Sequence, residues 1–261
     1  MHAAAVPHSR IAPSAGAASA LAELLVYESD RDMPRVAIPR PEIHLVVRFG
    51  PTTRSGLDVH ALGVSQAVRR KLIRRGQRIV MARLRLGASE AVLGVRASVT
   101  AGRIVPLEEL WDAAATRRLF DRLAGARDSV AAAAVLESAI AERVATTAAV
   151  RSSGADLALG AAARLTSASV NAVAAGLGVS ERHLLRVFRE TVGVSPKAFA
   201  RLARFRRAVR AATEVGAAGW ASIAADAGYY DQAHLIAEFR AIAGVTPGML
   251  LGELRAAPSV G

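Results

Sequence analysis

Three arginines at helical spacing carry the clearest chemical potential in this chain. Arg182, Arg186 and Arg189 fall on the outward side of a helix predicted over residues 181–190, and Leu185 shares that side. The inward side is apolar, formed by Leu184, Val187 and Phe188. A guanidinium is a planar fork of donors that can bond guanine O6 and N7 together, and it also pairs with phosphate. The outward side is therefore a candidate surface for recognising nucleic acid, with Arg186 as the first choice for guanine and Arg189 for phosphate.

A second outward surface is less charged. A helix predicted from Gln232 onward places Leu235 and Phe239 in the core and leaves these residues outside: Gln232, Ala233, Ile236 and Ala237. A glutamine amide can pair with adenine, and small apolar side chains can touch the methyl group of thymine. Gln232 is the candidate for the first contact, and Ala233 and Ile236 are the candidates for the second.

An internal repeat must position both surfaces. Six residues recur at an offset of 50 or 51, namely Ala174, Gly178, Leu184, Phe188, Gly193 and Pro196, answered by Ala224, Gly228, Leu235, Phe239, Gly244 and Pro247. Each copy predicts a helix, a tight turn at glycine and a second helix. Ser180 and Asp231 are the predicted N-caps of the second helices. The turn of the second copy is one residue longer than that of the first.

Two helices joined by a short glycine-containing turn form a helix-turn-helix, whose second helix can enter the DNA major groove. Two such units joined by a helical stretch over residues 196–213 resemble the DNA-binding domain of the AraC/XylS family of bacterial transcription regulators. The segments Val179–Phe188 and Ile223–Leu235 carry the resemblance, which covers about residues 155–255. It implies seven helices and base-reading positions at Arg182, Leu185 and Arg186. Family members commonly carry arginine or another polar residue where Ala237 stands.

Charge is distributed unevenly. The 261-residue chain has a formal net charge of +12, and residues 164–210 contain ten basic side chains against two acidic ones. Residues 211–261 contain two basic and five acidic side chains. Because phosphate contacts supply most non-specific affinity, we expect the first unit and the linker to anchor DNA and the second unit to contribute less. The alternative is that the arginines form a solvated helical face.

The amino-terminal part has a different texture. Residues 1–20 predict a disordered leader, and residues 21–150 predict a sensor or dimerisation domain resembling that of a subgroup of the same family. Strands are expected over residues 42–49, 57–64, 78–86 and 91–98, helices over 107–148, a linker at 151–154 and the DNA-binding domain over 155–256. The predicted fold class is therefore α+β, with a mixed, β-rich amino-terminal domain followed by an all-α domain of two helix-turn-helix units.

Several kinds of site are not indicated. The chain has no cysteine, and it has no glycine-rich phosphate loop, nucleophile elbow or paired acid motif. We therefore predict no catalytic residue, no cofactor and no metal, with metal binding by His44 and His60 on predicted strands as the alternative. A basic cluster at residues 69–85 predicts an exposed loop and helix face, with an anionic effector or extra DNA as the alternative. Pro13 and Gly16 interrupt the longest weakly polar stretch near the start, residues 11–22. We therefore expect neither a signal peptide nor a membrane partner, and we expect a cytoplasmic location.

The resemblance implies a sequence-specific regulator of transcription rather than an enzyme, with double-stranded promoter DNA and RNA polymerase as partners. Control by an unknown small-molecule effector and control by a homodimer contact both remain open. Two rivals also remain: a sequence-tolerant architectural DNA-binding protein, and a metal-dependent enzyme that uses DNA binding for recruitment only.

Overall fold

A six-stranded antiparallel sheet organises the amino-terminal half of the computed structural model, which describes residues 8–50, 52–53, 55–147, 153–215 and 219–256. The strand order is β1-β2-β7-β4-β5-β8, and β3 and β6 form a separate two-stranded ribbon. The strands are β1 (His8–Ile11), β2 (Leu21–Glu28), β3 (Met33–Ala37), β4 (His44–Phe49), β5 (Leu57–Leu62), β6 (Arg69–Ile73), β7 (Arg78–Leu84) and β8 (Ile104–Pro106). Alternating buried positions along β7 show that one of its faces is the core face.

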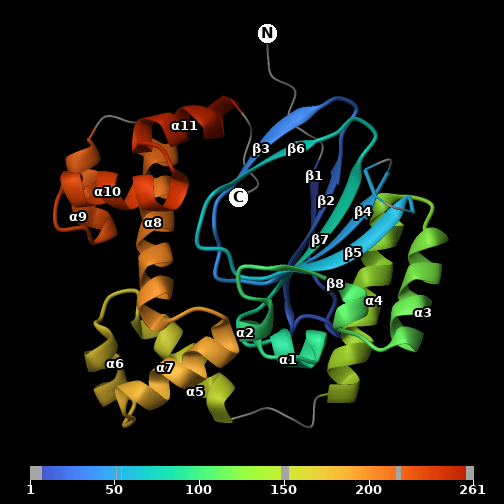
Figure 1. Cartoon of the computed structure of the whole chain (residues 1–261), viewed down its shortest axis with the longest axis horizontal. Coiled ribbons are helices and arrows are strands. Elements are labelled where there is room, and N and C mark those ends of the chain that lie inside the picture. Colours follow the sequence, from blue (N-terminus) through green and yellow to red (C-terminus); the bar gives the residue numbers. More distant parts are fainter. Residues whose placement is uncertain (1–7, 51, 54, 148–152, 216–218, 257–261) are drawn as a thin grey trace.

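Short helices and two longer ones complete this half. They are α1 (Ser89–Leu93), α2 (Ala97–Thr100), the 3-10 turn η1 (Leu107–Glu109), α3 (Ala113–Ala124) and α4 (Ser129–Thr147). The helix α4 packs across β2 and β7, and α3 lies against α4 (Figure 1). The helices expected over 107–148 are confirmed by α3 and α4 as far as Thr147, because residues 148–152 lie outside the described part of the chain.

Seven helices make up the described carboxyl half, as the resemblance implies. They are α5 (Ser153–Arg164), α6 (Val170–Gly176), α7 (Glu181–Val192), α8 (Pro196–Val215), α9 (Trp220–Ala227), α10 (Gln232–Ala243) and α11 (Pro247–Ala256). The long helix α8 runs between the group α5–α7 at one end and the group α9–α11 at the other (Figure 1). At 1.5 Å per residue, its 20 residues span roughly 30 Å.

The turn chemistry predicted for the repeat is confirmed. Ser180 Oγ accepts the backbone N–H of His183, and Asp231 Oδ1 accepts that of His234. Gly178 and Gly228 have φ values of +67° and +84°, a left-handed conformation that disfavours other residues. Local sequence therefore starts both second helices and closes both turns.

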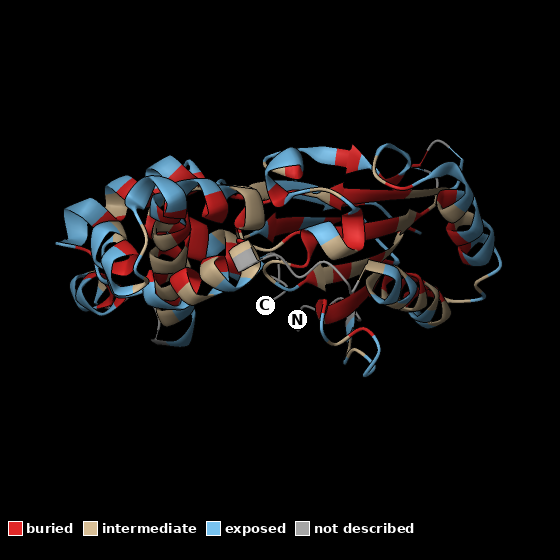
Figure 2. Cartoon of the chain, turned by 90° about the horizontal axis from the view of Figure 1, so that it is seen from below, coloured by how far each residue is buried: buried red, intermediate tan, exposed pale blue. Residues whose placement is uncertain are grey.

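The hydrophobic core continues from the sheet into the helical half. One cluster of buried side chains joins sheet residues such as Leu45 and Leu84 to Leu184 and Phe188 of α7. A second cluster surrounds Phe205 and Phe239 and includes Val36 of β3 and Val68, which directly precedes β6. Figure 2 shows buried residues inside both the sheet-containing and the helical parts. Both helix-turn-helix units are therefore packed against the amino-terminal half.

The leader expected over residues 1–20 is wrong for residues 8–20. Residues 8–11 form β1, which pairs with β2, and Ala17 and Ala20 are buried. The small side chains that look disordered by composition let this segment approach α4, where Ser14 N–H donates to Glu137 Oε1. Residues 1–7 lie outside the described residues.

Other boundaries also need correction. The strand expected over 91–98 is instead the end of α1, a left-handed turn at Gly94 and the start of α2, because a short apolar run does not distinguish a strand from a buried helix. The linker expected at 151–154 is wrong for residues 153 and 154, which belong to α5, and residues 151–152 lie outside the described part of the chain. The strands expected at 42–49, 57–64 and 78–86 are confirmed by β4, β5 and β7, each with somewhat shorter bounds.

No single helix in the described ranges combines the length and apolar character needed to span a membrane, although the bent pair α10 and α11 reaches the threshold on length and composition alone.

Candidate nucleic-acid interface

The outward side of α7 is exposed as its spacing predicts. Arg182, Leu185, Arg186 and Arg189 are all exposed, while Leu184, Val187 and Phe188 are buried. Arg182 and Arg189 have no side-chain hydrogen bond or ion pair with any described residue. Arg186 differs, because its guanidinium lies 3.4 Å from Glu190 Oε2 and 3.4 Å from His183 Nδ1. Arg182 and Arg189 are therefore free to bind a ligand, whereas Arg186 contacts Glu190 and His183.

The outward side of α10 presents no cation near its start. Gln232, Ala233 and Ala237 are exposed, and Ile236 is half-buried. Arg240, in the last turn, is the first basic side chain along α10 apart from the imidazole of His234. The geometry thus brings the predicted residues of the second unit onto one helix end, separate from those of α7.

The linker arginines are occupied within the molecule. Arg206 lies 4.0 Å from Glu42 Oε2 beside the sheet, and Arg207 donates to the carbonyls of Thr166 and Ala227. The remaining pairs are Arg201 and Arg204 with Glu238, and Arg210 with Glu214. The sequence predicts that the linker anchors DNA through these arginines. In the structure, each of the five already has a partner within the chain.

Glu238 is a buried charged residue that the sequence analysis did not single out. It lies on the inner side of α10 and is 8% exposed. Its carboxylate accepts Tyr229 OH at 2.9 Å and pairs with Arg201 and Arg204 of α8 at 3.4 and 3.3 Å. Burial and the neighbouring carboxylate raise the pKa of Tyr229, so that the hydroxyl remains a donor. The network fixes α10 against α8. The only feature of the sequence that could have indicated this network is an acidic residue between the inward-facing Leu235 and Phe239.

The amino-terminal half touches the carboxyl end of α7. Arg96, at the N-cap of α2, lies 3.3 Å from Glu190 Oε1. A Cβ added to Gly193, which ends α7 with a φ of +91°, would lie 3.0 Å from the carbonyl oxygen of Ala97. The two backbones therefore approach as closely as glycine permits.

A matching contact is made at the carboxyl end of α10. Arg70 of β6 donates to the carbonyl of Ala243, the last residue of α10, and to both carboxylate oxygens of Glu253 in α11. Just before β6, the backbone N–H of Val68 donates to the carbonyl of Ile242 at 2.9 Å. The amino-terminal half thus holds both second helices at equivalent ends.

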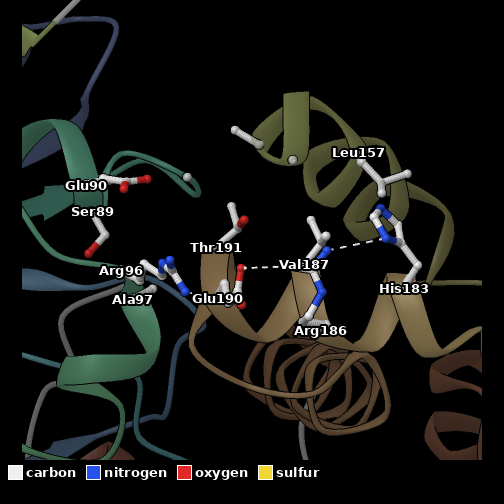
Figure 3. A pocket seen from close by; sticks show the side chains of 13 residues that line it. Ser89, Glu90, Arg96, Ala97, Leu157, His183, Arg186, Val187, Glu190 and Thr191 are labelled. Carbon is white, nitrogen blue, oxygen red and sulfur yellow. Dashed lines mark hydrogen bonds and ion pairs between the residues drawn. The ribbon is translucent and has the colours of Figure 1, made fainter. Parts of the chain in front are cut away.

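A cavity of about 340 Å³ lies where α1 and α2 face α5 and α7. Figure 3 shows Arg96 and Arg186 reaching Glu190 from opposite sides, with His183 beside Arg186. Leu157 and Val187 supply apolar lining. The cavity is therefore bordered by groups from both halves of the chain, including one predicted base-reading arginine.

The basic cluster at 69–85 has a different structure from the one expected. It forms β6, a turn and β7, rather than a loop and a helix face. Its arginines find separate partners: Arg70 meets Glu253, Arg74 meets Asp32, Arg83 meets Glu23 and Arg85 donates to the carbonyls of Ala18 and Leu21. These pairings distribute the cluster over several surfaces instead of concentrating it in one anion site.

The two strand histidines do not converge with other ligands. His60 Nδ1 lies 3.2 Å from Asp58, and burial together with nearby Arg40 and Arg83 lowers the pKa of His44 to about 3. Among the described residues, no group of three or more His, Asp and Glu could hold a metal ion.

The comparisons with known proteins agree with the helical half. Residues 173–252 match the family described as "Helix-turn-helix domain", of the AraC type. Two solved structures of ToxT from Vibrio cholerae are also similar. One has 11% identity, a TM-score of 0.42 and coverage of 88% of this chain and 96% of that chain. The other, with an unsaturated fatty acid bound, has 10% identity, a TM-score of 0.42 and coverage of 87% and 94%. No curated protein sequence matches the chain.

The matched residues 173–252 contain both predicted turns, both second helices and the whole of α8. This match accounts for the repeat and identifies residues 173–252 as a DNA-binding domain. The chain is therefore a DNA-binding transcription regulator that carries an AraC-type helix-turn-helix domain.

Proposed function

We propose that the chain regulates transcription by binding specific promoter DNA through both helix-turn-helix units, with α7 and α10 in successive major grooves on one face of the duplex. The observation that carries this proposal is the similar construction of the two units, a capped second helix after a glycine turn, at the ends of one continuous helix, α8. Successive major grooves lie about 34 Å apart, close to the length of α8. The regulators that the chain resembles are bacterial, and bacterial DNA lies in the cytoplasm, so the proposed site of action is the cytoplasm.

The proposed roles follow side-chain chemistry. Arg182, Leu185 and Arg186 read bases, with Arg186 paired to guanine, and Arg189 meets phosphate. In the second unit, Gln232 reads adenine, and Ala233 and Ile236 contact thymine methyl groups. The free guanidinium group of Arg182, at a base-reading position, supports a larger share of specificity for α7, and the acidic balance of the second unit supports a smaller share of affinity for α10.

A comparison of Arg186→Ala with Arg189→Ala tests this function. We expect Arg186→Ala to lose about 1–3 kcal/mol of discrimination between the operator and a duplex with the paired guanine replaced. Arg189→Ala should instead weaken binding to all duplexes and lower the salt slope by about 1. The measurement is fluorescence anisotropy at several salt concentrations, on operators identified by genome-wide mapping of binding sites. Equal losses on every duplex for Arg186→Ala would favour the architectural rival.

We further propose that the amino-terminal half controls access to DNA. It holds the carboxyl ends of α7 and α10 through Arg96 and Arg70. An effector in the cavity beside Arg96, or a homodimer contact on α3 and α4, that favours one arrangement of these contacts would shift the population able to bind a promoter and RNA polymerase. The location of the cavity between both halves supports the first route.

Replacement of Glu190 by glutamine is expected to raise DNA affinity by about two- to fivefold, the size of an exposed ion pair. The change releases Arg186 and removes a negative charge next to the DNA surface. The measurement is the Kd for the operator.

Arg96→Gln is the matched control, because it removes the Arg96–Glu190 ion pair between the halves and leaves the Arg186–Glu190 pair intact. An increase in affinity for both variants would indicate restraint by the amino-terminal half, and an increase for Glu190→Gln alone would indicate release of Arg186. Unchanged affinity for both variants would contradict a role for this ion chain.

A further inference from the structure

The turn of the second unit contains one residue more than the turn of the first, and the structure identifies that residue as Tyr230. In both units the residue after the turn glycine donates its N–H to the carbonyl five residues back. These bonds are Val179 N–H to Ala174 O at 3.1 Å and Tyr229 N–H to Ala224 O at 2.8 Å. The N-cap Ser180 then follows directly, whereas the N-cap Asp231 follows one residue later. Tyr230 is therefore inserted immediately before the helix α10.

The two adjacent tyrosines have opposite environments. Tyr229 is 5% exposed and gives its hydroxyl to Glu238, while Tyr230 is 94% exposed. No described residue forms a side-chain hydrogen bond with Tyr230. Burial in the fold therefore explains Tyr229, and nothing within the described chain explains a large aromatic side chain at position 230.

The position of Tyr230 relates it to DNA. The N-terminal residues of a recognition helix contact base edges, and the chain entering that helix passes near the phosphate backbone. Tyr230 precedes the N-cap of α10 and is followed by the exposed Gln232 and Ala233. Of the exposed side chains around this helix start, that of Tyr230 is the longest neutral donor.

Charge gives a reason for a neutral donor at this place. Residues 211–261 contain five acidic and two basic side chains, so they repel phosphate on balance. Tyrosine hydroxyls are among the uncharged groups that bond phosphate oxygens and position a protein on the duplex. Resting on the proposed function of the second unit, we propose that Tyr230 donates its hydroxyl to a DNA phosphate beside the groove entered by α10, and so sets the position of that helix.

The test uses the full chain with a labelled operator duplex and a scrambled duplex of equal composition. Tyr230→Phe removes only the proposed donor, and Met249→Ala, which truncates a 59% exposed side chain on α11, is the control. We expect Tyr230→Phe to raise the Kd by about three- to tenfold on both duplexes, the value of one hydrogen bond. The salt slope should stay unchanged, because a neutral donor releases no counterion. Met249→Ala should leave the Kd unchanged.

Three outcomes would overturn the proposal for Tyr230. In each of them the wild-type chain still binds its operator, so the proposed function would stand. Unchanged binding by both Tyr230→Phe and Tyr230→Ala would remove DNA as the partner of this side chain. Normal binding with reduced transcription would assign it to a protein partner instead. Normal binding by Tyr230→Phe, with lost discrimination at one base pair for Tyr230→Ala, would make the ring a base reader. Failure of the wild-type chain to bind any mapped operator would instead refute the proposed function itself.

Discussion

Glu238→Ala is expected to lower the free energy of unfolding by about 3 kcal/mol relative to the wild type. This value lies near the lower end of the range for removing one partner of a buried ion pair. The change leaves Arg201, Arg204 and the hydroxyl of Tyr229 without the carboxylate that joins them. The arginine side chains are 35% and 30% exposed, so water replaces part of the lost interaction. Urea unfolding measures the stability difference.

The same change should weaken operator binding more than stability alone explains, because the network holds α10 against α8 and thereby sets the spacing of the two reading helices. The loss should be concentrated in base pairs bound by the second unit. Anisotropy with operators mutated in either half tests this under conditions where the variant remains folded.

Two variants separate burial from charge. Glu238→Gln keeps the shape and one acceptor but loses the charge, and we expect a cost of about 1.5–3 kcal/mol. Glu214→Ala removes an acid from the exposed pair with Arg210 on α8, for which about 0.3–0.5 kcal/mol is expected. Should Glu238→Ala cost no more than Glu214→Ala, the buried network would not be what holds α10 in place.

Replacing Gly193 by alanine is expected to destabilise the contact between the two halves strongly. The left-handed backbone costs alanine roughly 1–2 kcal/mol. The new Cβ would lie 3.0 Å from the carbonyl oxygen of Ala97, and such overpacking adds about 1–3 kcal/mol. Relief requires α7 to move away from α2. Urea unfolding should report the combined cost, and hydrogen exchange should increase at α2.

Gly244→Ala is the matched control from the second copy of the repeat. Gly244 ends α10 with a φ of +74°, yet a Cβ there would meet nothing within 4 Å. Only the backbone cost should remain, so the difference between the variants measures the approach of the amino-terminal half to α7. Equal costs for both variants would contradict a tight contact at Ala97.

Local features of the helical half were predictable because they depend on neighbouring residues. Gly178 supplies a backbone conformation, and Ser180 and Asp231 supply caps within three residues of their acceptors. The repeat doubled this signal, which is why both units were predicted with nearly correct bounds. The outward position of Arg182 likewise follows from helical periodicity alone.

Long-range pairing was not predictable in the same way. Residues 8–20 carry a composition typical of disorder, but β1 finds a partner in β2 and Ala17 is buried. Residues 91–98 have the length of a strand, but two short helices form there under the sheet. The distant contacts are those of Ser14 with Glu137 in α4 and of α2 with α7, and the composition of a short segment carries little information about them.

The amino-acid sequence by itself determined the tandem helix-turn-helix architecture and the exposed face of α7, because helix periodicity, caps and turn glycines act over a few residues. Only the tertiary structure decided which arginines remain free. Arg182 and Arg189 have no described partner, whereas four arginines of α8 are bound across the fold to Glu238, Glu42 and backbone carbonyls, namely Arg201, Arg204, Arg206 and Arg207. A guanidinium has the same chemistry in every position, and the distance to the nearest carboxylate or carbonyl, set by folding, determines whether it is available to DNA.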